Sequence, residues 1–176
     1  MARCPGRKVK KIALGKSGLF TLVDDADYAA LSQFKWHAAS CGNPKFPPLR
    51  VYAVRSLALP NGKSTTRQMQ RDILRLQPGD GKFADHINRN TLDNQRSNLR
   101  VVTLQQNLWN RRKARNKSSR YLGVAWHSRR GKWVAIIRHA GRYEELGAFS
   151  DEIEAARAWN KKAAEYRGQY ARLNEI

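Results

Sequence analysis

Cysteine is scarce in this chain: Cys4 and Cys41 are the only two among 176 residues, and they lie far apart. No CxxC pair is present, which argues against a zinc ribbon, any structural zinc and a disulfide framework. Long apolar runs are also missing, since nothing approaches the roughly 18 consecutive apolar residues of a membrane-spanning helix. The basic start "MARCPGRKVKK" leads into no apolar signal region. We therefore expect a cytoplasmic chain with no membrane partner.

Acidic residues are absent from one long stretch of the chain. Between Asn94 and Tyr143 there are 13 Lys and Arg and no Asp or Glu, and the whole chain carries a formal net charge of +20. Such one-sided charge predicts a polyanionic partner. Five Trp and six Tyr argue against a disordered basic tail, which lacks large apolar side chains.

The N-terminal half contains short strand and helix patterns. Residues 11–24 predict a hairpin around the turn Gly-Lys-Ser-Gly. Tyr28, Leu31 and Phe34 follow at spacings of three, which predicts a short core-facing helix. The segments "KWHAASC" and "RVYAVRSLAL" are typical of strands, and "MQRDILRL" is typical of a further short helix.

The C-terminal segment has the clearest pattern. "YLGVAWHS", "KWVAIIRHA" and "RYEELGAF" predict three strands joined by tight turns, followed by a helix that Ser150 can cap and Gly168 can end. Alternation along the second strand predicts two faces, with Trp133, Ala135 and Ile137 on one and Lys132, Val134, Ile136 and Arg138 on the other. We expect a three-stranded antiparallel sheet packed on one helix.

The chain is long enough for two small domains. The segment "NRRKARNKSSR" shows no apolar periodicity after Trp109, which is typical of a basic linker. We therefore predict a first domain at residues 1–112, a linker at 113–119 and a second domain at 120–176.

One polar constellation stands out in "ADHINRNTLDNQRSNLR". A strand ending in Asp85 and His86 is followed by a loop, a second strand from Leu99 and a helix carrying Asn107. Packed as an antiparallel unit, these elements place Asp85 near the first turn of that helix. A carboxylate and an amide oxygen suit a hard divalent cation whose other ligands are water and phosphate.

This segment resembles the HNH nucleases of the ββα-metal superfamily, in particular the homing type with an Asp-His, Asn, Asn pattern. The resemblance is closest over "DHINRNTLDNQRSNLRVVTLQQNLWN" and implies an α+β fold with a ββα-metal core at about 82–112. It implies that Asp85 and Asn107 bind one Mg²⁺ or Mn²⁺ ion, that His86 is the general base and that Asn98 braces the active-site loop. The resemblance therefore predicts these four residues as the catalytic set.

The implied reaction is hydrolysis of a DNA phosphodiester. Neutral His86 would take a proton from the attacking water, and the products would carry a 5′-phosphate and a 3′-hydroxyl. Asn88, Asn90, Asp93 and Asn94 are interpreted as turn formers. Family members often have a His where this chain has Gln70, which either keeps a hydrogen-bonding role or weakens activity.

The last 56 residues, from Tyr121, resemble the ethylene-response-factor (apetala-type) DNA-binding domain of plants, through "YLGV", "GKWVAIIR", "LGAF", "EAARAWNKKA" and "RGQYARLN". That family lays its sheet in the major groove of DNA. Its arginines early in the first strand correspond here to Leu122, Ala125 and His127, so its GC-rich target is not carried over. The predicted DNA contacts of the whole chain are Arg71, Arg111, Arg112, Lys113, Trp126, Arg129, Arg130, Lys132, Arg138 and Arg142.

The resulting hypothesis is a monomeric, site-specific, metal-dependent endonuclease acting on double-stranded DNA without a small-molecule cofactor. The resemblance places it in a bacterium or a phage-infected host cell, in homing or phage propagation. One alternative is a non-cleaving DNA-binding regulator that keeps the nuclease fold. Another is an RNA-binding protein, which the charge permits equally. Nicking and double-strand cleavage both stay open.

Overall fold

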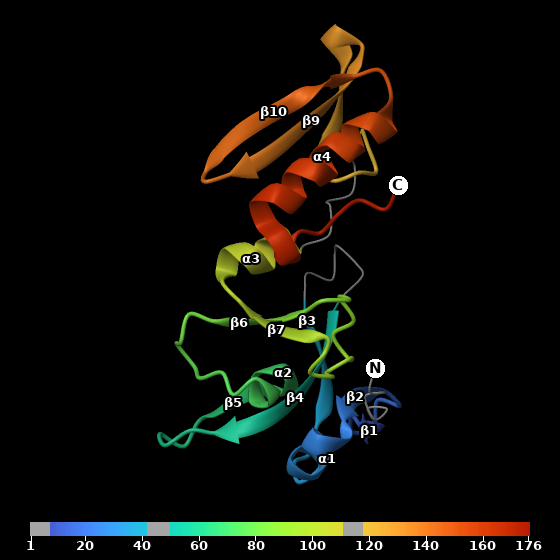
Figure 1. The fold of residues 1–176 in the computed structure, drawn as a ribbon. Coiled ribbons are helices and arrows are strands. Elements are labelled where there is room, and N and C mark those ends of the chain that lie inside the picture. The colour runs from blue at the N-terminus through green and yellow to red at the C-terminus, as the bar shows by residue number, and fades with distance from the viewer. Residues whose placement is uncertain (1–7, 42–49, 111–117) are drawn as a thin grey trace, which may run out of the picture. The chain divides into compact units, whose positions relative to one another are not determined.

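The computed structural model describes residues 8–41, 50–110 and 118–176 and combines helices with antiparallel sheets, the α+β class expected from the sequence (Figure 1). The chain divides into two compact units, Met1–Leu104 and Gln105–Ile176. Most of the predicted linker lies outside the described residues. Ser118 and Ser119 are described, and each accepts a hydrogen bond from a backbone N–H of the second unit.

The first unit begins with the predicted hairpin, β1 (Val9–Ala13) and β2 (Phe20–Asp24), which pair antiparallel. Helix α1 (Asp25–Leu31) follows and buries Leu31. The prediction for Phe34 was wrong, because the helix ends at Leu31 and the Phe34 side chain is exposed. Trp36 occupies the core instead, and its indole N–H donates to the Leu31 carbonyl at 2.8 Å.

A three-stranded antiparallel sheet in the order β3-β4-β5 completes most of this unit. It consists of β3 (His37–Cys41), β4 (Arg50–Ala58) and β5 (Ser64–Gln68), and helix α2 (Met69–Ile73) follows. Strand β5 was not predicted, because its sequence "STTRQ" lacks apolar alternation. The buried core gathers side chains from these two sheets, from both helices and from a third strand pair that contributes Leu99: its members are Ile12, Leu14, Val23, Leu31, Trp36, Ala53, Met69, Ile73 and Leu99.

Strands β6 (Phe83–His86) and β7 (Leu99–Val102) form a separate antiparallel pair, in which Asp85 faces Arg100 and His86 faces Leu99. The connecting loop at 87–98 contains most of the asparagines noted in the sequence. Helix α3 (Leu104–Trp109) comes after β7. The chain therefore has the predicted order of strand, loop, strand and helix.

The second unit contains the predicted three-stranded sheet, in the order β10-β9-β8, packed on helix α4 (Figure 1). Its strands are β8 (Val124–His127), β9 (Lys132–His139) and β10 (Arg142–Phe149), its long helix is α4 (Glu152–Arg167), and two short 3₁₀ turns are η1 (Ser128–Arg130) and η2 (Gly168–Tyr170). Asp151, not Ser150, caps α4, because its carboxylate accepts from the Glu154 N–H. Gly168 ends the helix as predicted.

The core of the second unit confirms the predicted inner face of β9, whereas Val134, predicted on the other face, is also buried. Ala135 and Ile137 are buried against α4, and Trp133 packs at the edge of the same cluster. Gly123 lets Trp159 lie against the strand, because a Cβ at this position would be 1.9 Å from the indole nitrogen of Trp159. Its φ of +70° also favours glycine.

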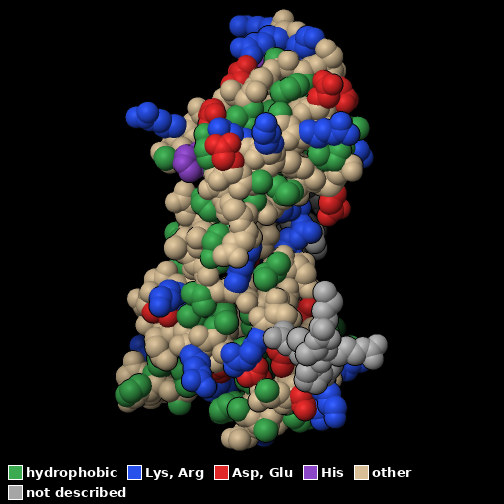
Figure 2. Space-filling view, viewed as in Figure 1, with side chains coloured by type: hydrophobic (Ala, Val, Ile, Leu, Met, Phe, Trp, Pro, Cys, Tyr) green, Lys and Arg blue, Asp and Glu red, His purple; other side chains and the backbone are tan. Residues whose placement is uncertain are grey.

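Lys and Arg side chains are spread over both units on the face that Figure 2 shows, with fewer acidic side chains among them. None of the helices in the described part of the chain has the length and apolar character needed to cross a membrane.

Candidate functional site

Asp85 and His86 end strand β6, and both side chains are buried, with 7% and 5% of their surface exposed. Arg100, opposite Asp85 on β7, donates from Nε and Nη2 to the same carboxylate oxygen, Oδ2, at 2.9 and 2.8 Å. Burying a carboxylate is costly unless it has such a hydrogen-bonded partner. The strand pairing therefore places the Asp85–Arg100 ion pair beside His86.

The His86 ring is held from one side by Asn94, whose Oδ1 lies 3.1 Å from Nε2. The ring of Tyr52 on β4 lies at a tilt, with 6.3 Å between the centroids. Burial lowers the pKa of His86 below its ordinary value. The hydrogen bond to Asn94 and the nearby Asp85 and Asp93 carboxylates oppose this shift. The net effect favours the neutral imidazole, which is the form a general base needs.

Asn98 fastens both ends of the 87–98 loop. Its Oδ1 accepts from the Asn88 N–H at 2.9 Å, and its Nδ2 donates to the Asp93 carbonyl at 2.7 Å. Its backbone carbonyl also accepts from the Ile87 N–H. This geometry fits the loop-bracing role implied by the resemblance, and it explains why a polar side chain is buried here.

The rest of the loop is tied to the body of the unit. Leu22 of β2 exchanges backbone hydrogen bonds with Leu92 and Asn94, and the Thr91 hydroxyl donates to the Val51 carbonyl. Asn88 donates through its side chain to Asp93 at 2.7 Å. The turn-forming interpretation therefore fits Asn88 and Asn90, which accept from backbone N–H groups two residues ahead.

Asn94 is more than a turn former. It is fully buried and joins His86 to Thr21 of β2 by its two amide atoms. Sequence reasoning missed this residue because the Thr21 contact spans 73 positions. One feature of the sequence could have singled it out: Asn94 directly follows Asp93, whereas the other asparagines of the loop are each flanked by residues that are neither Asn nor Asp.

The predicted metal ligands belong to different units. Asp85 lies in the first, whereas Asn107 is a half-buried residue of α3 in the second. Within the three described ranges, no group of three or more His, Cys, Asp or Glu side chains could hold a metal ion. The predicted pair is a smaller set, and its oxygen donors match the preference of Mg²⁺ for one or two protein ligands completed by water and phosphate.

Gln70 and Arg71 of α2 both make hydrogen bonds within the first unit. Gln70 is 2% exposed, its Nε2 donates to Gln68 at 3.1 Å, and its Oε1 has no partner among the described residues. Arg71 donates to the carbonyls of Lys82 and Gln77 and to Asp80, so its guanidinium organises the 77–82 loop. Its predicted DNA contact stays a prediction.

The sheet of the second unit carries several of the remaining predicted contacts, and Arg138 lies on its outer face, because it alternates with the buried Ala135 and Ile137. Arg138 lies opposite Tyr143, with its guanidinium 5.5 Å from the ring centroid. Tyr143 is 76% exposed, which is unusual for a large aromatic side chain. A cation and an aromatic ring are therefore presented together to solvent.

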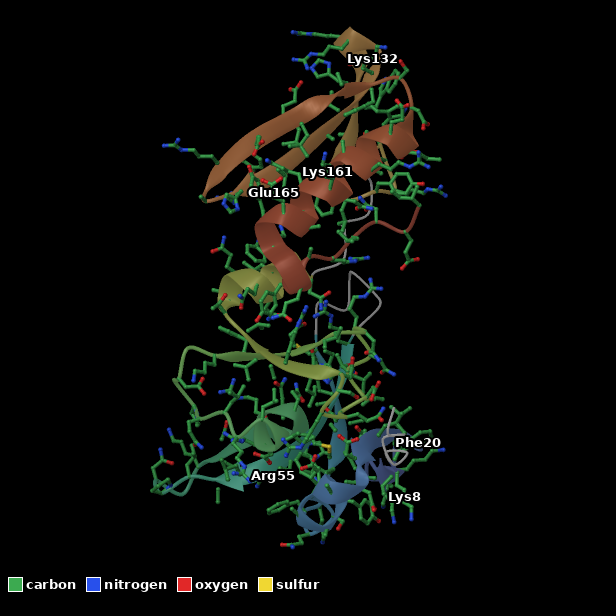
Figure 3. All side chains as sticks on the ribbon, in the orientation of Figure 1. Lys8, Phe20, Arg55, Lys132, Lys161 and Glu165 are labelled. Atoms are coloured by element: carbon green, nitrogen blue, oxygen red, sulfur yellow. The ribbon has the colours of Figure 1, made fainter. Side chains whose placement is uncertain are left out.

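Four of the other predicted contacts lie near the β8–β9 turn, whereas Arg142 lies at the far end of β9, opposite His139: the four are Trp126, Arg129, Arg130 and Lys132. Trp126 is 44% exposed and packs edge to face on Trp133. Arg130 pairs with Glu145, and Lys132, labelled in Figure 3, donates to Ser150 at 2.7 Å. Arg129 and Arg142 are exposed. Arg111, Arg112 and Lys113 lie outside the described residues.

Comparisons with known proteins give two kinds of match. The HNH endonuclease family model matches residues 77–108. The chain is 29% identical to an uncharacterised HNH endonuclease of Acanthamoeba polyphaga mimivirus, over 90% of this chain and 76% of that protein. It is 27% identical to Protein 3.8 of Escherichia phage T7, over 53% of this chain and 76% of that protein.

The second kind of match comes from plants. An AP2-like ethylene-responsive transcription factor of Arabidopsis thaliana is 40% identical over 38% of this chain, but the match spans only 14% of the plant protein. No solved structure gives a significant match. The chain thus combines a segment at residues 77–108 that matches the HNH endonuclease family model with a segment similar to plant AP2-like transcription factors.

Proposed function

We propose that this chain is a site-specific, metal-dependent endonuclease that hydrolyses one phosphodiester bond of double-stranded DNA at a time. The observation that carries the proposal is the buried Asp85–His86 pair at the end of β6, beside a loop that Asn98 ties together. The pair joins a proposed metal ligand and a proposed base on one strand, within the segment that matches the nuclease family model.

His86 is the proposed general base. Burial lowers the pKa of its ring and so favours the neutral form, which can accept a proton from the water that attacks the scissile phosphorus. Asp85 and Asn107 would hold one Mg²⁺ or Mn²⁺ ion, which when bound stabilises charge on the leaving 3′ oxygen. Asn98 keeps the loop in the conformation that carries these groups. The expected products have a 5′-phosphate and a 3′-hydroxyl.

The second unit is the proposed DNA-recognition domain, which would bind the target sequence. We assign residues 1–112 to the nuclease domain and 120–176 to the DNA-binding domain, joined by the basic linker 113–119. Arg138 and Tyr143 offer a base or phosphate contact on the exposed sheet face. Two weak binding events joined by a short linker become one tight event over a longer DNA site.

The proposed biological role rests on the viral and phage origin of two of the matching proteins. HNH-named and phage proteins among the matches support a mobile element, of homing or phage type, inside a bacterial or virus-infected cell. One active site in a monomer favours nicking as the primary event.

One observation favours the alternative of a non-cleaving regulator. Arg100 already occupies one oxygen of Asp85, the proposed metal ligand. If that ion pair persists on DNA, the fold would bind its site without cutting it.

The test is a cleavage assay that reads the chemistry of the product ends. The chain is incubated with supercoiled DNA carrying a candidate site, with Mg²⁺ or with chelator, and the open circles are treated with DNA ligase. Resealing without prior end treatment supports hydrolysis to a 5′-phosphate and a 3′-hydroxyl. Binding without any cleavage would support the regulator.

A further inference from the structure

A chain of buried hydrogen bonds leads from strand β2 to the ring of His86. The Thr21 hydroxyl lies 2.7 Å from the Leu92 carbonyl, the Asn94 Nδ2 lies 2.9 Å from that hydroxyl, and the Asn94 Oδ1 lies 3.1 Å from His86 Nε2. Thr21 and Asn94 are both fully buried. All of these residues belong to the first unit.

The donor and the acceptor of every hydrogen bond in this series follow from the first bond, between Thr21 and Leu92. A carbonyl only accepts, so the Thr21 hydroxyl must donate to Leu92. Its lone pairs then accept from the Asn94 amide nitrogen, which can only donate. The Asn94 amide is thereby oriented with its oxygen toward His86, and that oxygen can only accept.

The reverse direction is excluded by one contact. If Thr21 donated to Asn94 instead, its oxygen and the Leu92 carbonyl oxygen would face each other 2.7 Å apart with no hydrogen between them. Two acceptors do not approach so closely in a buried site. The Asn94 backbone is also fixed, since its N–H donates to the Leu22 carbonyl at 2.8 Å.

We propose that Thr21 and Asn94 are positioning residues that fix the tautomer of His86, placing the hydrogen on Nε2 and the basic lone pair on Nδ1. This inference rests on the proposed function, because the tautomer matters for cleavage only if His86 is the base. Neither residue touches the reacting atoms. They act by presenting one defined ring nitrogen, which a base needs as much as a suitable protonation state.

The direct test is a ¹⁵N spectrum of the His86 ring in the full chain, at a pH where the imidazole is neutral. A pyrrole-type shift at Nε2 and a pyridine-type shift at Nδ1 are expected. The opposite assignment in the wild type would overturn the inference, whether or not the chain cleaves DNA. Absence of DNA cleavage by the wild type would instead overturn the proposed function.

Two variants separate orientation from packing. Thr21→Val keeps the shape of the side chain but removes the hydroxyl, so Asn94 can rotate and a mixture of tautomers is expected. Thr21→Ser keeps the hydroxyl and should retain the wild-type spectrum. The kcat of Thr21→Val should fall by roughly 10- to 100-fold with little change in KM, as a weakened base requires. Unchanged tautomer and kcat in a folded Thr21→Val protein would contradict the inference.

Discussion

Arg100 faces Asp85 across the β6–β7 pair and holds one carboxylate oxygen with two donors, at 2.9 and 2.8 Å. The side chains are 17% and 8% exposed, so the ion pair is largely shielded from water. It offsets the cost of burying the Asp85 carboxylate, and it also competes for an oxygen that the proposed metal ion needs. Two opposing effects on stability and metal binding follow.

Arg100→Gln should lower the free energy of unfolding on the order of 3 kcal/mol, because it leaves a buried carboxylate without its cation. The same change should raise the affinity for Mn²⁺, since a competing charge is gone. Thermal unfolding with and without Mn²⁺ measures both effects. Arg96→Gln is the matched control, because the exposed Arg96–Asp27 pair should contribute below about 1 kcal/mol. Equal losses in both variants, or unchanged Mn²⁺ affinity, would count against this account of Asp85.

The pH dependence of cleavage follows from the burial of His86. Burial lowers its pKa below the ordinary value of 6.5, so the rate should rise with pH through a midpoint below 6.5 and then level off. A flat rate between about pH 5 and about pH 8 would argue against the role of His86 as base.

The free energy of unfolding should also rise with pH. Below pH 6.5 the unfolded chain binds a proton at His86 that the folded chain binds less readily, so the His86 contribution to stability is lost as the pH falls through the lowered pKa. The difference in unfolding free energy between wild type and His86→Gln, measured across this range, isolates the effect. A difference that does not change with pH would show that folding leaves the pKa unaltered.

Gly123→Ala should unfold the second unit. The new Cβ would lie 1.9 Å from the Trp159 indole nitrogen and 2.7 Å from the Ile136 carbonyl oxygen, a clash expected to cost roughly 3 kcal/mol or more. Gly131→Ala has a similar positive φ but no neighbour within 4 Å, so it should cost only about 1 kcal/mol. Near-ultraviolet circular dichroism during thermal unfolding distinguishes the two. Equal stability of both variants would contradict the packing described for β8 and α4.

Arg138→Gln should weaken duplex binding and lower the slope of log affinity against log salt by about one, as the loss of one phosphate contact requires. Lys161→Gln removes the same charge from α4, which covers the opposite face of the sheet (Figure 3). Fluorescence anisotropy at several salt concentrations compares them. An equal or larger effect at Lys161 would place the DNA on the helix side.

The sequence predicted the local elements well where apolar periodicity was strong. The inner face of β9 is as expected, because Ala135 and Ile137 are buried against α4, although Val134 on the other face is buried as well. Strand β5 was missed because its polar side chains give no such signal. It forms as the third strand of its sheet, and β4 supplies its hydrogen-bonding partner.

The site was predictable only in part. Asp85 and His86 stand out as neighbours at a strand end, and the structure buries both together. The relation of Asn94 to His86 depends on Thr21, a contact that only the folded chain creates. The engagement of Arg71 with the 77–82 loop is likewise tertiary, because nothing in "MQRDIL" shows which carbonyls will surround the guanidinium.

The most direct test of the central claim compares wild type, His86→Ala and His37→Ala on supercoiled DNA carrying a bound site. His37 is an exposed histidine on β3 of the same unit and serves as the matched control. We predict that wild type and His37→Ala convert the DNA with Mg²⁺ and not with chelator, whereas His86→Ala binds it equally but leaves it intact. Cleavage by His86→Ala at the wild-type rate, or tight binding without cleavage by all three, would contradict the account.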